Sequence, residues 1–259
     1  MGNASSANET MRCSVIASDL PPLIAVIGCD GSGKSTVIEA VLAWANRFAP
    51  ADGAHLGKQS GNIGRSLARL PLIGGVLDRV IARKTNKTRA KRSREKMPGL
   101  MTALVICAFS LRRARRFQCM MALRRRGVII VSDRYPQLDV AGGYDGPALS
   151  VDATGNGNVL VRWMARRERA LFEWMTSYRP DLVIRLNVDL DIACARKPDH
   201  RREMLAPKIA ATPLLKFNGA PIVDVDANRP LDEVLAAATA ATTRLLLARG
   251  YPEPRPGQC

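Results

Sequence analysis

A glycine-rich segment near the start of the chain limits its fold more than any other feature. Residues 28–36 fit the pattern G-x-x-x-x-G-K-[ST] of phosphate-binding loops; they are Gly28, Cys29, Asp30, Gly31, Ser32, Gly33, Lys34, Ser35 and Thr36. An apolar run at 23–27 comes before the loop and predicts a buried strand. Residues 35–48 come after it and have apolar side chains at helical spacing. This order predicts an α/β protein that binds a polyphosphate.

The fixed positions of the loop each have a physical role. Glycines permit backbone angles with φ > 0, so successive N–H groups can face one anion. The helix that follows adds the partial positive charge of its N-terminus. Lys34 is expected to contact the β- and γ-phosphates of ATP, and the Ser35 hydroxyl is expected to bind Mg²⁺. We therefore expect all of residues 28–36 to bind ATP, with Mg²⁺ as cofactor.

Apolar runs and amphipathic segments alternate along the rest of the chain. Further buried strands are expected at 128–131, 182–186 and 222–225, and helices at 98–126, 160–178, 191–211 and 231–249. The alternation favours a parallel sheet with helices on both faces, an α/β fold of three layers. We expect one domain over 21–250, a basic insertion at about 79–97, and flexible tails at 1–20 and 251–259.

An acid and a base follow the expected strand at 128–131. In an open α/β sheet, ligands gather beyond the carboxyl ends of the strands. Asp133 stands at such an end and can hold Mg²⁺ directly or through water, beside the phosphates. Arg134 follows it and can clamp a phosphate with its planar guanidinium.

Four motifs together resemble thymidylate kinases and their relatives over roughly residues 22–248. They are Asp30 at the third position of the phosphate loop, the triplet Asp133-Arg134-Tyr135, the arginine-rich segment 196–203, and Asp226-Ala227 before the last helix. The resemblance implies the three-layer P-loop kinase fold, a parallel sheet with helices on both faces and a basic lid at 196–203. It also implies ATP-dependent phosphoryl transfer to a small phosphorylated acceptor, with thymidylate or another nucleoside monophosphate as the first expectation.

The resemblance also implies roles for single residues. Asp30 would contact the acceptor's sugar hydroxyl, Arg134 would hold the acceptor phosphate, and Asp226 and Ala227 would lie beside the adenine. Arg196, helped by Arg201 or Arg202, would close over the transferred phosphoryl group, where cations stabilise the spreading negative charge. The expected catalytic residues are Lys34, Arg134 and Arg196, and the expected acceptor-binding residues are Asp30, Arg112, Arg134 and Tyr144.

The acceptor half of the chain departs from the family pattern. Residues 55–61 replace the family's Arg-Glu-Pro-Gly-Gly stretch, and residues 143–147, which include Tyr144, replace an aromatic-Gln-Gly loop. Two alternatives therefore stay open. One is a kinase that acts on a saccharide or lipid-linked precursor. The other is a non-catalytic nucleotide-binding adaptor, tethered by its basic segment.

The chain carries 39 basic and 23 acidic residues, a formal net charge of +16, so it attracts anions. The stretch 79–96 holds nine Lys or Arg and one Glu. It can gather an anionic acceptor or dock on an anionic membrane surface. Nucleic acid is disfavoured, because no aromatic residues interleave with the charges for base stacking. A homodimer stays open.

The six cysteines form no C-x-x-C pair and fit no zinc site. They indicate free thiols and a reducing, cytoplasmic protein that is able to associate peripherally with a membrane. No secretory signal is visible at the N-terminus, and the apolar run at 100–111 is too short to span a bilayer.

Overall fold

The computed structural model describes residues 20–57, 99–140, 144–149 and 159–253. The expected basic insertion at 79–97 and the membrane-docking stretch 79–96 lie outside these residues. The described elements, in chain order, are β1 (Leu23–Gly28), α2 (Lys34–Ala45), β2 (Ala51–His55), α5 (Leu100–Arg125), β3 (Ile129–Asp133), α6 (Val159–Thr176), β4 (Leu182–Asn187), α7 (Leu190–Arg196), α8 (Arg202–Ala211), η1 (Thr212–Leu214), η2 (Phe217–Gly219), β5 (Ile222–Asp226) and α9 (Leu231–Ala248).

The five strands form one parallel sheet in the order β2-β3-β1-β4-β5. β1 lies in the centre, and Leu23 to Val26 are fully buried. A strand that is covered on both faces has a continuous run of apolar residues, so β1 could be predicted from the sequence. The expected α/β fold with a parallel sheet is confirmed.

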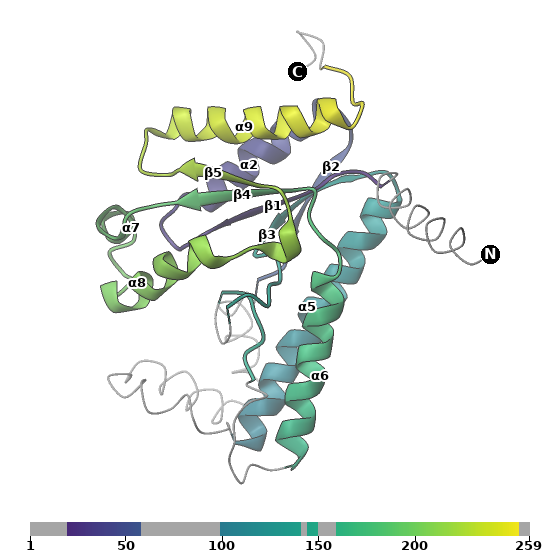
Figure 1. Cartoon of the computed structure of the whole chain (residues 1–259), viewed down its shortest axis with the longest axis vertical. Helices are drawn as coiled ribbons and strands as arrows, with labels where there is room; N and C mark the ends of the chain where they lie inside the picture. Colours follow the sequence, from purple (N-terminus) through teal and green to yellow (C-terminus); the bar gives the residue numbers. More distant parts are fainter. Residues whose placement is uncertain (1–19, 58–98, 141–143, 150–158, 254–259) are drawn as a thin grey trace, which may run out of the picture.

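Helices cover both faces of the sheet (Figure 1). Ile24 and Val26 of β1 pack with Val37 and Val41 of α2 and with α9 on one face. Leu23, Ala25 and Ile27 turn to the other face, toward α5 and α6. Successive side chains of a strand point to opposite faces, so β1 contributes to both halves of the core and fixes the three layers.

The structure adds one strand that was not expected and divides one expected helix. β2 is not predicted, because Ala-Asp-Gly-Ala-His lacks an apolar run; among the described strands it lies at the sheet edge and pairs with β3. The single helix expected over 191–211 is two helices, α7 and α8, separated at 197–201. Pro198 lies in this break, and proline disfavours helical backbone at the residue before it.

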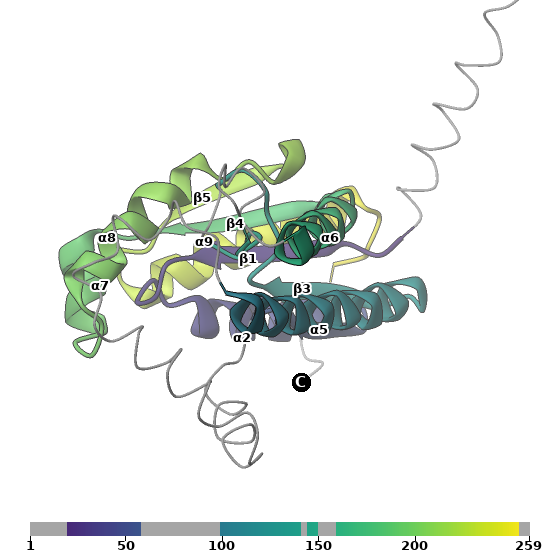
Figure 2. The ribbon, with the colours of Figure 1, turned by 90° about the horizontal axis from the view of Figure 1, so that it is seen from below.

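Helices α5 and α6 lie side by side and extend well beyond the sheet (Figures 1 and 2). Both begin at the far end and run toward the sheet. A small core of their own holds that end together; it consists of Ala103, Leu149, Val161, Met164 and Ala165, with Leu100, Ile106 and Cys107 packed against it. None of the helices in the described part of the chain combines the length and the apolar character that crossing a bilayer requires.

Candidate functional site

The phosphate loop joins the carboxyl end of β1 to the first turn of α2. Gly33, with φ of 83°, turns the chain into the helix. Gly31 has φ of 91°, and a Cβ there would lie 2.8 Å from the backbone oxygen of Ala193 in α7. Both positions favour glycine. As at any helix start, the N–H groups of the first turn lack an acceptor within the helix, so they can bind an anion.

Lys34 is itself a residue of this loop, and its side chain is partly buried. Its Nζ donates to the backbone oxygen of Cys29 over 2.6 Å. Burial lowers the pKa of Lys34, and the charge of Arg134 acts in the same direction. Asp30 and Asp133 oppose the shift. A cation held against a neutral carbonyl is available to a stronger, charged acceptor.

Asp30 connects the loop to two other elements. Its carboxylate accepts hydrogen bonds from Lys208 Nζ in α8 and, over 3.3 Å, from Arg134 Nη2. Burial by itself would raise the pKa of Asp30, but the Lys208 hydrogen bond and the charges of Lys208, Lys34 and Arg134 outweigh it and lower the pKa to about 2. Asp30 is therefore an anion that holds helix α8 against the loop; we call α7 and α8 together the lid.

Asp133 reaches the loop because β3 pairs directly with β1, and its register partner is Val26. Its Oδ2 lies 2.8 Å from His55 Nδ1, at the end of β2. Its Oδ1 is buried, and no described residue offers it a hydrogen bond. A buried carboxylate oxygen of this kind is costly unless a donor or cation satisfies it.

Arg134 adopts a left-handed backbone conformation, with φ of 57°, which is uncommon outside glycine and clusters at functional sites. The turn aims its side chain at three carboxylates, at 3.3 Å from Asp30, 3.9 Å from Asp133 and 4.0 Å from Asp145. Gly57 leaves room for it, because a Cβ there would lie 2.4 Å from Arg134 Cδ.

Arg196 ends α7 and reaches across to the loop after β5. Its Nη1 donates to the backbone oxygen of Ala227 over 2.9 Å. Ala227 is buried, whereas Asp226 beside it is exposed and accepts a hydrogen bond from the backbone N–H of Asn228. Of this expected adenine-side pair, only Ala227 borders the cleft described next.

These groups line one cleft of about 580 Å³ at the carboxyl edge of the sheet. Its lining contains most of the expected site residues, namely Asp30, Gly31, Ser32, Gly33, Lys34, Ser35, Thr36, Asp133, Arg134, Arg196 and Ala227. Five Lys or Arg and two Asp line it, so the cleft is positive and suits a polyanion. Its volume is in the range of small-molecule sites.

The expected acceptor side is organised differently from the expectation. Arg112 is exposed and does not line the cleft, whereas its neighbour Arg113 is buried. Arg113 holds Asp145 by hydrogen bonds of 2.6 Å to its backbone oxygen and 2.5 Å to its carboxylate. Tyr144 borders a cavity of about 30 Å³ together with Gly28, Lys34 and Arg134. That volume has room for little more than a water molecule.

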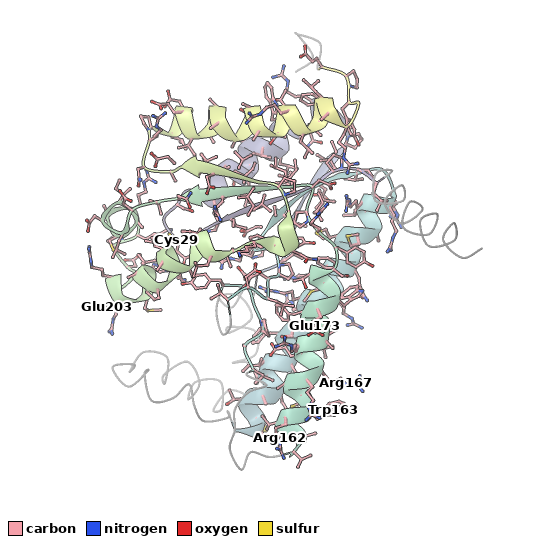
Figure 3. All side chains as sticks on the ribbon, viewed as in Figure 1. Cys29, Arg162, Trp163, Arg167, Glu173 and Glu203 are labelled. Carbon is pink, nitrogen blue, oxygen red and sulfur yellow. The ribbon has the colours of Figure 1, made fainter. Side chains whose placement is uncertain are left out.

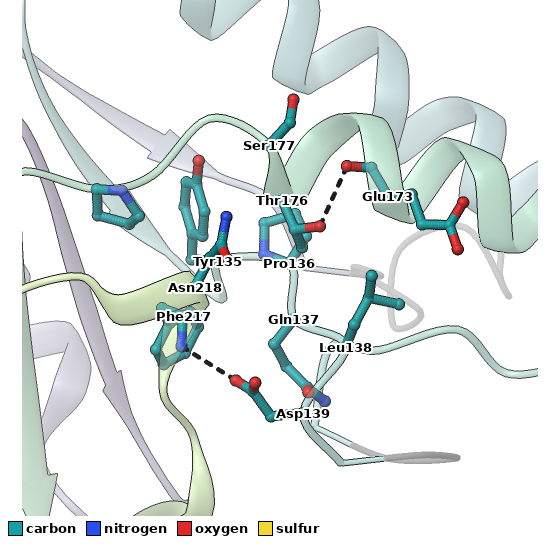
Figure 4. Close-up of a pocket in the computed structure, with 11 residues that line it drawn as sticks. Tyr135, Pro136, Gln137, Leu138, Asp139, Glu173, Thr176, Ser177, Phe217 and Asn218 are labelled. Carbon is teal, nitrogen blue, oxygen red and sulfur yellow. Dashed lines mark hydrogen bonds between the residues drawn. The ribbon is translucent and has the colours of Figure 1, made fainter. Parts of the chain in front are cut away.

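Two residues of the motifs face other cavities. Cys29 does not line the cleft and borders a separate hollow of about 200 Å³; burial raises the pKa of its thiol. Tyr135 lines a third cavity, of about 270 Å³, with Phe217 and Asp139 (Figure 4). Its hydroxyl donates to the backbone oxygen of Tyr178, so Tyr135 anchors the triplet in the core.

No group of three or more His, Cys, Asp or Glu that could hold a metal occurs in the described residues. Ser35 and Asp133 nevertheless fit Mg²⁺, because this ion uses one or two protein oxygens and completes its shell with water and substrate phosphates. The unsatisfied Oδ1 of Asp133 is such an oxygen.

Comparison with known proteins identifies relatives along nearly the whole chain. The chain is 42% identical over 229 residues to the uncharacterized ATP-binding protein YghS of Escherichia coli strain K12, a match that covers 88% of this chain and 95% of YghS. The chain belongs to the same family as YghS. The uncharacterized ATP-binding protein YghR of the same strain is 39% identical over 226 residues, which cover 86% of this chain and 88% of YghR. No protein-family model matches the chain.

Sequence reasoning did not select three residues that the structure brings into this region. His55 contacts Asp133, Lys208 contacts Asp30, and Arg113 holds Asp145. The position of His55 after a strand was hidden because β2 has no apolar pattern. Lys208 stood among many basic residues of the lid, and nothing local distinguished it.

Proposed function

We propose that the chain binds Mg-ATP in the 580 Å³ cleft and transfers the γ-phosphoryl group to a small phosphorylated acceptor. The observation that carries the proposal is the convergence of Lys34, Arg134 and Arg196 on the phosphate loop. Three cations around one anion-binding loop are the arrangement that phosphoryl transfer requires. YghS and YghR, both named ATP-binding proteins, support ATP as the ligand.

The residues would act mainly by positioning and by charge. The loop N–H groups and Lys34 would hold the β- and γ-phosphates, and Ser35 and Asp133 would hold Mg²⁺. When bound, the ion would neutralise negative charge on the phosphates. Arg196 would leave the carbonyl of Ala227 for the transferring group, since a phosphate oxygen is the stronger acceptor.

The acceptor would bind on the side of Arg134 and Tyr144. Arg134 would exchange its carboxylate partners for the acceptor phosphate, and the 30 Å³ cavity there must widen for a nucleotide to enter. Asp145, which Arg113 holds in place, would have to move for this cavity to widen. A nucleoside monophosphate such as thymidylate is the first acceptor that we propose to test.

The test is an ADP-release screen with Mg-ATP against nucleoside monophosphates and sugar phosphates, with Lys34→Ala as the matched control. We expect one acceptor to raise ADP release at least tenfold over ATP alone, and K34A to abolish this increase while its circular dichroism is unchanged. Binding of ATP without any acceptor response would favour the adaptor alternative, and full activity of K34A would exclude the assigned role of the loop.

A further inference from the structure

The far end of the α5–α6 pair carries an exposed apolar surface. Six of the ten large apolar side chains exposed in the described residues lie on these two helices, and all but Leu111 fall within the first five residues of their helix: Met101 (53%), Leu104 (44%), Leu111 (56%), Val159 (71%), Leu160 (44%) and Trp163 (52%). We call these six the tip patch. Such a concentration of exposed apolar side chains marks an interaction site.

The tip patch is not needed to join the two helices. Ala103, Val161, Met164 and Ala165 already pack between them as a separate buried core. In α5, Met101, Leu104 and Leu111 follow helical spacing, so they form one stripe about 15 Å long on the outer face. This stripe is available to something outside the described chain.

In the described residues, the exposed charges beside the tip patch are mainly arginines. Exposed arginines lie beside it at 112 and 115 in α5 and at 162, 166 and 167 in α6. α5 contains no acidic residue. Of the two acids in α6, Glu168 is buried against Ser110, and the exposed Glu173 is paired with Arg169. The surface therefore complements an anion.

Trp163 connects the apolar and basic parts. The Arg167 guanidinium lies 5.3 Å from the centre of the Trp163 ring, and Figure 3 shows Arg162, Trp163 and Arg167 projecting outward from α6 near its far end. Tryptophan is enriched where water meets a bilayer. Arginine can lay its stem on apolar surface while its charged end contacts phosphates.

We propose that the tip patch docks on the surface of an anionic lipid bilayer. A second copy of the chain fits poorly, because it would bring two arginine clusters of like charge together. An acidic protein would need a hollow that fits two projecting helix ends, whereas a bilayer accepts apolar groups at any point of its surface. No residue of the tip patch lines the cleft, so docking leaves the cleft open.

The test is co-sedimentation of the full chain with vesicles of phosphatidylcholine alone or with 30% phosphatidylglycerol. We expect binding to the anionic vesicles only. Each basic residue near such a surface raises partitioning about fivefold, so Arg162→Glu with Arg166→Glu should lower it by at least ~25-fold. The double variant Leu160→Ser with Trp163→Ser, which removes two apolar side chains of the tip patch, should abolish binding. Brominated acyl chains should quench tryptophan fluorescence in the wild type and not in Trp163→Phe.

Matched controls lie elsewhere on the molecule. Leu214→Ser removes an apolar side chain (61% exposed) that is at least as exposed as Leu160 and Trp163, and Arg244→Glu reverses an exposed charge on α9. Both variants should bind as the wild type does. The proposal is overturned by absence of binding, by equal binding to neutral vesicles, or by binding that the tip variants leave unchanged. Binding to polyglutamate in place of vesicles, or a dimer that the tip variants dissociate, would also overturn it. None of these results depends on whether the cleft transfers a phosphoryl group.

Discussion

At the scale of single residues, the three cations assigned to catalysis are all bonded to acceptors of the protein itself. Lys34 donates to Cys29, Arg196 donates to Ala227, and Arg134 lies among carboxylates. Two of these acceptors are neutral carbonyls, which bind a cation less strongly than a phosphate does. Binding of a polyphosphate would therefore replace these carbonyl and carboxylate acceptors with phosphate oxygens.

Arg196→Ala separates binding from transfer. Because the resemblance places Arg196 over the transferring group, we expect the rate constant for transfer to fall by ~10³-fold or more, while the dissociation constant for ATP changes only a few-fold. Arg169→Ala is the matched control, since Arg169 is exposed and pairs with Glu173 outside the cleft. Equal effects of the two variants on transfer would argue against the role of Arg196. Single-turnover kinetics gives the measurement.

Asp30→Asn tests the contact between loop and lid. The folded-state pKa of Asp30 is lowered to about 2 from 3.8, so its charge stabilises the fold above the unfolded pKa and this contribution is lost as the pH falls through about 2. We expect the variant to lose roughly 2 kcal/mol of unfolding free energy at pH 7 and about half of that at pH 3.

Urea unfolding at the two pH values measures this difference. Glu39→Gln, an exposed acid on α2, is the control and should change little at either pH. A loss in D30N that is the same at pH 7 and pH 3 would contradict the assigned ion pairing.

Single residues show how much of this site could be predicted from the sequence alone. The positions of Asp133 and Arg134 beside the loop follow from β3 pairing with β1, and buried central strands are readable as apolar runs. The contact of Lys208 with Asp30 spans 178 positions and depends on how the lid folds back. No local pattern records such a contact, and the same holds for Arg113 and Asp145.

At the scale of elements, the amino ends of β1 and β4 are tied to two helix ends by one carboxylate. Asp181, just before β4, accepts hydrogen bonds from the Leu23 N–H over 2.8 Å, from Arg124 of α5 over 2.6 Å and from Arg249 after α9. Arg124 is buried, and burial lowers its pKa. The side of the sheet opposite the cleft is thus fixed by a shared ion pair.

Asp181→Ala should lower the unfolding free energy by about 3–5 kcal/mol, because it leaves the buried charge of Arg124 without its partner. Glu173→Ala breaks an exposed i,i+4 pair and should cost under about 1 kcal/mol. Chemical denaturation of both variants checks the contrast. Costs of similar size would mean that the Asp181 cluster is not the stabilising contact that its burial indicates.

The lid is the element where sequence and structure differ most. A basic segment at 191–211 with helical spacing predicted one helix, yet Pro198 and its neighbours divide it, so α7 carries Arg196 and α8 carries Lys208. Two short helices can place two cations on different parts of the loop, which one straight helix of that length could not do.

At the scale of the whole molecule, the strand order determines where the site forms. With β1 in the centre and β3 and β4 on either side, the loop after β1 lies between Asp133 and the lid that follows β4. The order was not readable from the sequence, since edge strand β2 lacks an apolar pattern. The cleft and the tip patch are formed by different residues, so nucleotide binding and docking on a bilayer, as proposed, would not compete for the same side chains.

The central claim is that this cleft binds a nucleoside triphosphate through the loop and Lys34. Calorimetric titration of Mg-ATP into the full chain, and into K34A that keeps its circular dichroism, tests the claim most directly. We expect saturable binding of one ATP per chain, weakened at least ~tenfold in K34A because a charged hydrogen bond is lost. Absence of binding to the folded wild type, or equal affinity in K34A, would contradict the claim.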